Sequence, residues 1–420
     1  MLRFAFSPTH DMNIGDLRVA ILNYIVSKQR SEGLIVRIED RDKERNIEGK
    51  DKEIVGILEL FGIEYSQVVN QSQNFRFHAA MALQLLLEAK AYSCFCSPEW
   101  LEKKREEAKN NKEAYIYDDA CASLPDELVI DNENPFTVRI KKSQEPITIK
   151  DYIKGEMILK PQELESFIIM SEDKRPTYSF ACGIDDMLSD ISLVICDEEH
   201  MSDAPKEDWI RTSLGYQKKI EYAHLPVMQD SASSVKWLLE EGYLPSAIAN
   251  YLILIGNKPP KEIFDIKEAI EWFSLENISK SPECFDINML KHINKEHLRM
   301  LDAKELSRYV GFADTEIGEL AKIYLEEIST TKELKSKIQL IFSQKEIPEE
   351  LEESADIIVK TIKSAPYFDE YEDFKNYIMK ESGLKGKNFF KPLRVLLTGS
   401  EHGPDIALVY KYIKNYMGEI

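Results

Sequence analysis

The 420-residue chain has few cysteines, little glycine or proline, and no long apolar run. Six unevenly spaced cysteines are too few for a disulfide scaffold, and 17 glycines with 17 prolines exclude a collagen-like or low-complexity chain. No apolar stretch approaches the roughly 18 residues that span a bilayer. The first residues also lack the charged head, apolar run and cleavage site of a secretory signal. We therefore expect a cytoplasmic protein that does not bind membranes.

Positive charge is scarce as well. The chain has 54 lysines and arginines against 74 aspartates and glutamates, which gives a formal net charge of −20. This balance argues against a large basic surface for nucleic acid, although a total can hide a local basic patch. A hydrophobic fraction of 43% over this length predicts two to four globular domains with sizeable cores.

The apolar pattern predicts an α/β fold at the start of the chain. Residues 2–6 and 34–38 read as short buried strands, and the segment from about Ile14 has helical periodicity. Strand, helix and strand in this order are typical of a parallel sheet with a right-handed crossover. The sequence therefore predicts a parallel α/β domain at this end of the chain.

The middle of the chain has a different texture. From about residue 92 to residue 161 the segments are short, charged and rich in turns, and residues 136–140 and 156–159 read as strands of a small inserted α+β unit. Apolar strands at 166–170 and 191–195 indicate that the large sheet resumes. After about residue 236 the pattern is nearly all helical, which predicts all-α C-terminal domains.

The segment from Arg3 to Asp16 carries the first candidate chemistry. A strand ends in a turn with Ser7 and Thr9, and the turn leads into a helix through Asn13 and Gly15. Helix N-termini present free backbone N–H groups and the positive end of a dipole, so they favour phosphate. By pattern alone an ordinary strand-to-helix turn is the alternative interpretation.

This segment resembles the start of the class I glutamyl-tRNA synthetases, whose pattern is R-F-A-P-S-P-T-G-x-x-H-I-G-x-x-R. Their next block, R-I-E-D-T-D-x-x-R, is similar to R-I-E-D-R-D-K-E-R at residues 37–45. Further blocks follow in the family's order, namely P-T-Y-S-F-A from Pro176, E-E-H at 198–200, A-H-L-P from Ala223 and a C-terminal block at 385–404. The resemblance extends over essentially the whole chain.

The resemblance implies a fold with five segments. It comprises a Rossmann-type class I catalytic domain with an inserted acceptor-stem-binding unit, followed by helical stem-contact and anticodon-binding domains. The expected boundaries are 1–91 and 165–230 for the two halves of the catalytic domain, 92–164 for the insertion, 231–300 for the stem-contact domain and 301–420 for the anticodon-binding domain. Because the family is usually monomeric, the resemblance also implies a monomer.

The resemblance also implies a reaction, the activation of glutamate with ATP and Mg²⁺ and its transfer to the 3′ end of tRNA. By position, Arg3 would bind the side-chain carboxylate of glutamate, and Glu39 would hold its ammonium group. The other residues of the amino-acid site would be Ala5, Ser7, Tyr178 and Cys196, those facing ATP Thr9, Asn13 and Gly15, and the catalytic ones Asn13, Gly15 and Glu198.

The chain departs from the family pattern at several places, among them Phe6, His10, Asp16, Arg41 and Asp197, and three further departures bear on the chemistry. Asn13 stands where H-I-G-H has its first histidine, and Cys196 stands where R-G-E-D-H has its arginine, the family's second contact with the glutamate side chain. The lysine loop, G-K-K-(L/M)-S-K-R, is missing, and no Lys or Arg lies between Lys219 and Lys236. Loss of one donor to developing charge costs roughly 100- to 1000-fold in rate. A second interpretation therefore stays open, a synthetase paralogue that binds tRNA without forming the adenylate.

Two smaller groups carry further expectations. Cys94, Cys96, Tyr117 and Cys121 have a spacing that suits one tetrahedral zinc ion, and some members of the family bind zinc in this insertion with a similar arrangement. Three buried free thiols are the alternative. Near the C-terminus, Lys385, Lys387 and Arg394 form a basic cluster that is a candidate contact for tRNA, the alternative being a solvated face.

Other polar residues are expected to have structural roles. Asp185 and Asp186 read as solvated or capped carboxylates at a strand end, and His200 and His224 as side chains with satisfied hydrogen bonds.

Overall fold

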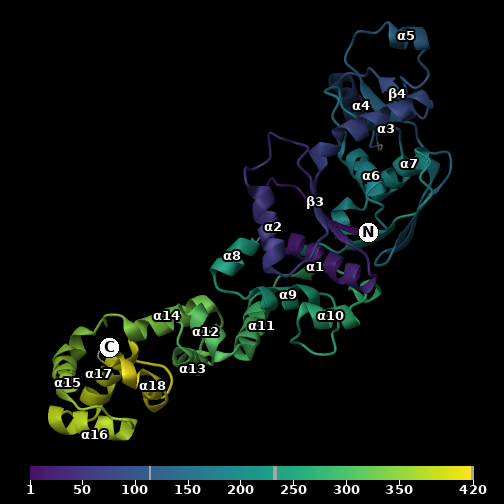
Figure 1. Ribbon diagram of the computed structural model, residues 1–420. Helices are drawn as coiled ribbons and strands as arrows, with labels where there is room; N and C mark the ends of the chain where they lie inside the picture. Colours follow the sequence, from purple (N-terminus) through teal and green to yellow (C-terminus); the bar gives the residue numbers. More distant parts are fainter. Residues whose placement is uncertain (113–114, 230–233, 418–420) are drawn as a thin grey trace. The chain divides into compact units, whose positions relative to one another are not determined.

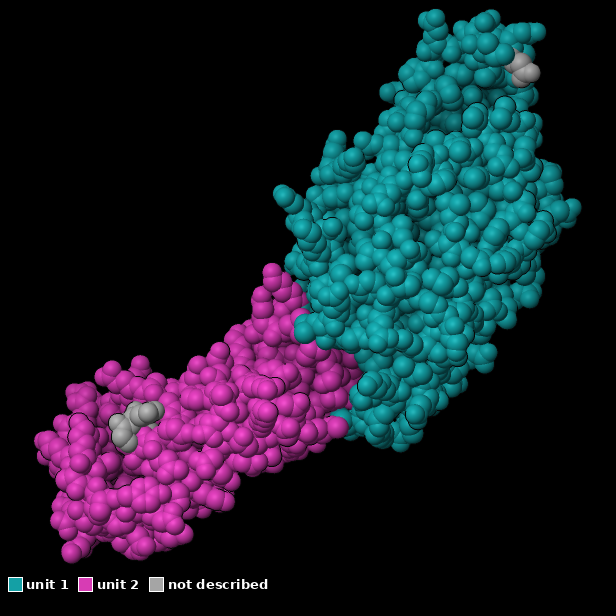
Figure 2. Space-filling view, in the orientation of Figure 1, with its two compact units in different colours: residues 1–235, 252–285 teal, residues 236–251, 286–420 magenta. Residues whose placement is uncertain are grey.

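The computed structural model describes residues 1–112, 115–229 and 234–417. It divides into two compact units, which Figure 2 shows in different colours. The N-terminal unit comprises residues 1–235 and 252–285, and the C-terminal unit comprises residues 236–251 and 286–420. Among the described residues, no helix is both long and apolar enough to cross a membrane.

The N-terminal unit is built on a seven-stranded sheet with the order β3-β2-β1-β9-β10-β6-β7, in which only β7 is antiparallel to its neighbour. The strands are β1 (Leu2–Phe6), β2 (Leu34–Ile38), β3 (Gln67–Asn70), β6 (Ile147–Asp151), β7 (Gly155–Leu159), β9 (Leu193–Asp197) and β10 (Glu221–Leu225). Strand β1 is buried except for the partly buried Ala5, and β9 is buried over its first three residues, which are apolar. The predicted α/β fold class is confirmed.

Helices connect the parallel strands and cover the sheet. Helix α1 (Ile14–Gln29) packs against β1 and β9, and α6 (Tyr178–Leu188) packs against α7 (Ala204–Ser213). In Figure 1, α6 and α7 lie beside each other next to the sheet. The remaining helices before β9 are α2 (Lys50–Leu60), α3 (Phe75–Leu87), α4 (Pro98–Asn110) and α5 (Asp126–Ile130).

A separate antiparallel sheet of three strands, in the order β4-β5-β8, forms the insertion. Its strands are β4 (Ala91–Cys94), β5 (Thr137–Ile140) and β8 (Phe167–Met170). Two predictions are therefore wrong, because residues 166–170 do not continue the large sheet and residues 156–159 lie in the large sheet as β7. Apolar periodicity identifies a strand, but the partner of that strand depends on contacts distant in sequence. The predicted domain boundaries stay predictions.

The rest of the described chain is almost entirely helical, as predicted. Beyond the short pair β11 (Met228–Gln229) and β12 (Glu283–Cys284), its helices are α8 (Val235–Glu240), α9 (Pro245–Leu254), α10 (Ile266–Trp272), α11 (Ile287–Met300), α12 (Ala303–Tyr309), α13 (Thr315–Tyr324), α14 (Thr331–Phe342), α15 (Glu352–Ser364), α16 (Tyr371–Ser382), α17 (Lys387–Thr398) and α18 (Ile406–Ile413). Helices α12 and α13 touch at Gly318, where a Cβ atom would lie only 1.6 Å from the carbonyl oxygen of Ala303.

Candidate active site

The candidate site lies where the parallel strands end. Ala5 of β1 pairs with Arg37 of β2, and Cys196 of β9 pairs with His224 of β10. Paired residues of neighbouring strands project to the same face of a sheet. Open α/β sheets bind ligands at the carboxyl ends of their strands, at the point where the strand order reverses. In this sheet that point lies between β1 and β9.

A cavity of about 180 Å³ occupies this position. All six residues predicted for the amino-acid site line it, namely Arg3, Ala5, Ser7, Glu39, Tyr178 and Cys196. They meet because most of them lie at or just after a strand end, where short stretches of chain converge. The residues predicted to face ATP, Thr9, Asn13 and Gly15, are not among the lining residues of this cavity.

Arg3 is held in place by a buried carboxylate. Its Nε donates to Oδ1 of Asp186 at 3.2 Å, and its Nη2 donates to Oδ2 at 3.4 Å. Arg37 contacts the same carboxylate through Nη1 at 2.5 Å. Burial by itself would raise the pKa of Asp186, but the two guanidinium groups hold that pKa below its usual value. Asp186 therefore stays ionised and orients Arg3 towards the cavity.

This finding corrects the interpretation of the two neighbouring aspartates. Both lie within α6 and are buried, so neither is solvated nor at a strand end. Asp185 accepts hydrogen bonds from Gln71, Asn74 and His78, each at 2.8 Å. Two adjacent acidic residues are usually exposed to solvent. Asp185 and Asp186 are buried because they pair with residues that are distant in the sequence.

Glu39 continues the ionic network. Its Oε1 accepts from Nη2 of Arg37 at 3.0 Å and from Sγ of Cys182 at 3.4 Å. Tyr178 begins α6 and stacks on His200, with 5.4 Å between ring centroids. Burial raises the pKa of Tyr178 well above its ordinary value, so its hydroxyl stays protonated. The cavity is thus polar, with its charged groups fixed by one another.

Asn13 is the N-cap of α1. Its Oδ1 accepts from the backbone N–H groups of Gly15 at 2.7 Å and Asp16 at 3.0 Å, and Asp16 in turn accepts from the N–H of Asn13 at 2.9 Å. This reciprocal pair is a capping box, which uses N–H groups that would otherwise be available to phosphate. The sequence carries the signal for it, since Asn-x-x-Asp precedes an apolar run.

Acidic groups with raised pKa values stand near the helix start. Burial raises the pKa of Asp16 to about 6. Burial, together with the charge of Asp16, also raises the pKa of Asp197 to about 6.

Glu198 lies outside the lining of the cavity. It forms an ion pair with Lys154, and it accepts a hydrogen bond from the N–H of Val227 at 3.2 Å. The structure therefore gives Glu198 a bridging position between two loops.

The two histidines predicted to be structural both line the cavity. His200 lies 3.7 Å from Asp203. His224 contacts Asp151 through Nδ1 at 2.6 Å, while its Nε2 is buried and has no hydrogen-bond partner among the described residues. The prediction that the hydrogen bonds of His224 are satisfied is therefore confirmed for Nδ1 and wrong for Nε2.

The chain matches known families over nearly its full length. Residues 1–292 match the catalytic domain of the class I tRNA synthetases (E and Q), and residues 295–414 match an anticodon binding domain. A protein of Sulfurimonas denitrificans named glutamate–tRNA ligase 2 is 74% identical, with both chains fully covered. The chain belongs to the class I tRNA synthetases. A glutamate–tRNA ligase 1 of a Nitratiruptor species is 54% identical, also over both full chains.

Solved structures agree on the fold of this synthetase. The crystal structure of a glutamate tRNA ligase from Elizabethkingia meningosepticum has a TM-score of 0.82 with it, at 23% identity, and the match covers 99% of this chain and 97% of the other. The predicted family and fold are therefore confirmed. The alignments with the relatives from Sulfurimonas and Nitratiruptor each span 430 positions, so at least ten positions have no residue in this 420-residue chain. The position expected for the lysine loop follows Gln229, and residues 230–233 there lie outside the described part.

The insertion of this synthetase brings the predicted metal ligands together. The sulfur atoms of Cys94, Cys96 and Cys121 lie within 4.8 Å of one another. The hydroxyl of Tyr117 lies 3.4 Å from both Cys94 and Cys96. Nε of Arg139 lies 3.4 Å from the sulfur of Cys94. Burial opposes ionisation of Cys94, but hydrogen bonds from Tyr117 and Arg139 outweigh it and lower its pKa to about 7.

The predicted basic cluster is only partly available to a ligand. Lys385 and Lys387 are exposed. Arg394 is half-buried, and its Nη1 donates to the carbonyl oxygens of Gly403 at 3.3 Å and Pro404 at 2.8 Å. Arg394 therefore stabilises the loop after α17, a role that the basic pattern alone did not indicate.

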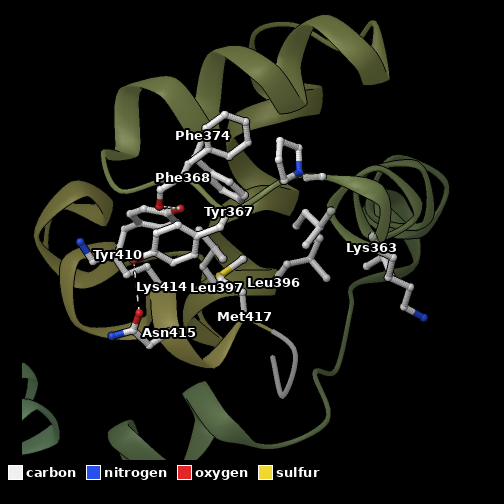
Figure 3. A pocket seen from close by; sticks show the side chains of 14 residues that line it. Lys363, Tyr367, Phe368, Phe374, Leu396, Leu397, Tyr410, Lys414, Asn415 and Met417 are labelled. Atoms are coloured by element: carbon white, nitrogen blue, oxygen red, sulfur yellow. Dashed lines mark hydrogen bonds between the residues drawn. The ribbon is translucent and has the colours of Figure 1, made fainter.

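A second cavity in the C-terminal unit escaped the sequence analysis. It has a volume of about 520 Å³ and lies among α15, α16, α17 and α18. Figure 3 shows aromatic rings on one side of it and lysines at its margin. The principal rings are Tyr367, Phe368, Phe374 and Tyr410, and the lysines are Lys363 and Lys414. A run of aromatic residues from 367 to 377 was the available signal.

Proposed function

We propose that the chain is a glutamate–tRNA ligase, which activates glutamate with ATP and Mg²⁺ and transfers it to the 3′ end of tRNA. One observation carries the proposal beyond family membership. Arg3, fixed by Asp186, shares a small polar cavity with Glu39. A guanidinium group and a carboxylate in one cavity fit a ligand that carries both a carboxylate and an ammonium group. Glutamate has this combination.

Six of the lining residues have a place in this proposal. Arg3 binds the side-chain carboxylate of glutamate, and Glu39 holds the ammonium group. Ala5, Ser7 and Cys196 leave room for the substrate, and Tyr178 closes the cavity at the start of α6. Because the charged groups are oriented by one another before substrate arrives, little reorganisation accompanies binding.

For ATP, the start of α1 is the proposed contact. Thr9 is partly exposed, and Gly15 leaves room for the Asn13 cap, since a Cβ there would lie 3.0 Å from Oδ1 of Asn13. The Asn13 side chain has an amide NH₂ group that can donate to phosphate while its oxygen caps the helix. The match to an anticodon binding domain supports tRNA as partner.

We further propose that the cysteine cluster binds one zinc ion. Three sulfurs and the Tyr117 oxygen lie close enough to share one tetrahedral ion. Zinc at this place would join β4 to the segment after α4 and stabilise the insertion.

A second candidate function is tRNA binding without adenylate formation. It is favoured by the absence of any Lys or Arg between Lys219 and Lys236. Without cations on the departing pyrophosphate, the transition state loses charge stabilisation. The acidic groups Asp16 and Asp197 add unfavourable charge near the helix start.

Acylation of total bacterial tRNA with labelled glutamate, ATP and Mg²⁺ distinguishes the two candidates. Turnover well above the enzyme-free control, lost in Arg3→Ala, supports the ligase. Salt-sensitive tRNA binding by a folded chain that forms neither adenylate nor glutamyl-tRNA supports the second candidate and contradicts the first.

A further inference from the structure

His224 has one ring nitrogen that the fold leaves free. The side chain is 1% exposed, and the ring stacks on Tyr222 with nearly parallel planes, 5.5 Å between centroids. Nδ1 contacts Oδ2 of Asp151 at 2.6 Å. On the opposite edge of the ring, Nε2 is buried without a partner among the described residues, in a side chain that lines the same cavity as Arg3. A buried polar atom without a partner is costly, and in a cavity it indicates a ligand group.

Asp151 fixes the state of this ring. Its Oδ1 accepts from the N–H groups of Ile153 at 2.8 Å and Lys154 at 2.7 Å, and its Oδ2 also accepts from the N–H of His224 at 3.0 Å. Burial opposes the charge, but these donors lower the pKa of Asp151, so the carboxylate stays ionised. An ionised carboxylate at Nδ1 compensates a proton added at Nε2, and the protonated ring donates from that atom.

We propose that His224, oriented by Asp151, donates from Nε2 to the side-chain carboxylate of glutamate and thereby shares its recognition with Arg3. The inference rests on the proposed glutamate site and names a further specificity-determining residue in it. Cys196 is the strand partner of His224, and its short side chain leaves the space between the imidazole and the ligand open. Two cationic donors favour a carboxylate over the neutral amide of glutamine.

The proposal implies that one proton is taken up when glutamate binds, because Nδ1 is already committed to Asp151. Other groups around the ring can change their own protonation and must be separated from it. The titratable and charged groups that share its cavity wall are Arg3, His10, Asp16, Glu39, Tyr178, Cys196, His200, Glu207 and Tyr222. Asp151 and Glu198 interact with the ring from outside that wall. A comparison of variants at position 224 isolates the part of the proton uptake that belongs to the imidazole of His224.

The test is calorimetric titration of the full-length chain with L-glutamate at pH 8, in buffers of different ionisation enthalpy. His224→Asn keeps a donor near the position of Nδ1 for Asp151 but ends short of Nε2. His224→Gln places an amide nitrogen near Nε2. We expect Kd to rise roughly 10- to 100-fold in His224→Asn, as for loss of a hydrogen bond to a charged group. In His224→Gln the Kd for glutamate should rise about threefold. In His402→Asn, a control at an exposed residue, the Kd should not change.

Proton uptake is the second readout, and the wild type should take up about one proton more on binding glutamate than His224→Asn does. The proposal is overturned if His224→Asn binds glutamate as the wild type does, or if it takes up the same proton. Failure of the wild type to bind glutamate overturns both this inference and the ligase proposal. Unchanged binding in the variant overturns this inference alone, so the two failures are distinguishable.

Discussion

Replacement of Asp186 by asparagine is the sharpest test of how this site is built. One buried carboxylate contacts two buried guanidinium groups, through Nε and Nη2 of Arg3 and through Nη1 of Arg37. Asparagine has nearly the same shape and keeps one acceptor oxygen, but it removes the charge. Glu39 still pairs with Arg37 at 3.0 Å, whereas Arg3 loses its carboxylate partner. The variant therefore leaves positive charge uncompensated in the interior.

The size of the effect follows from that loss. Removal of one partner from a buried ion pair costs about 3–5 kcal/mol. We expect Asp186→Asn to lower the free energy of unfolding of the N-terminal unit by about 4 kcal/mol at pH 7. Urea denaturation followed by tryptophan fluorescence measures it, since Trp209 and Trp272 lie in that unit. The affinity for glutamate should fall as well, because Arg3 is no longer held in place.

The pH dependence gives a second check with a fixed sign. Because the folded pKa of Asp186 is lowered, its contribution to stability is complete above the unfolded value of about 3.9. The contribution is lost as the pH falls through the folded pKa. The difference between wild type and variant should therefore be full at pH 7 and shrink below about pH 4.

Asp190→Asn is the matched control, since Asp190 is exposed and pairs with Lys218 on the surface. This change should cost less than about 1 kcal/mol. A loss in Asp186→Asn no larger than that of the control would refute the buried-network reasoning.

Three further predictions concern other parts of the N-terminal unit. Asp197→Asn should raise the free energy of unfolding by about 2–3 kcal/mol at pH 8 and change it little at pH 4. Burial, together with the charge of Asp16, raises the pKa of Asp197 to about 6, so the wild type loses stability as the pH rises from about 4 to 6. Asn13→Ala should cost about 1 kcal/mol in urea denaturation, with Asn13→Ser near wild type, because serine also caps helices. Cys121→Ser should lower zinc from about one ion per chain to none by elemental analysis, with Cys284→Ser, a change at an exposed thiol, as control.

Local pattern predicted the elements that position the site. Strands β1 and β2 are short runs of apolar residues, and their periodicity identifies them without knowledge of partners. Six residues that line the cavity could be named from the sequence because the resemblance to the family assigned them by position. The order of strands in the sheets was not predictable to the same degree, as β7 and β8 show. Their sequences fit a strand in either sheet, and only packing decides between them.

The burial of Asp186 and Asp151 could not be predicted from the sequence, and the physical reason is the same for both. Asp186 and Asp151 look like ordinary surface acids in the sequence, and each is buried because of partners far away along the chain. Arg3 and Arg37 lie 183 and 149 positions from Asp186, and His224 lies 73 positions from Asp151. Burial of a charge requires a specific partner, and a single sequence does not show pairs. Asn13 differs, since its capping box is local and was readable as Asn-x-x-Asp.

The two halves of the site differ in what supports them. On the side of Arg3 and Glu39, buried charges hold one another, so loss of one member weakens the others. On the side of the helix start, the side chain of Asn13 occupies backbone N–H groups, the pKa values of Asp16 and Asp197 are raised, and the sequence from 220 to 235 contains no Lys or Arg. We therefore expect glutamate binding and adenylate formation to be separable in this chain. Calorimetry with glutamate alone and pyrophosphate exchange with ATP measure them independently. If the first is intact and the second is weak, the limiting step is charge stabilisation on the phosphates, whereas loss of both would place the defect in the Arg3–Asp186 network.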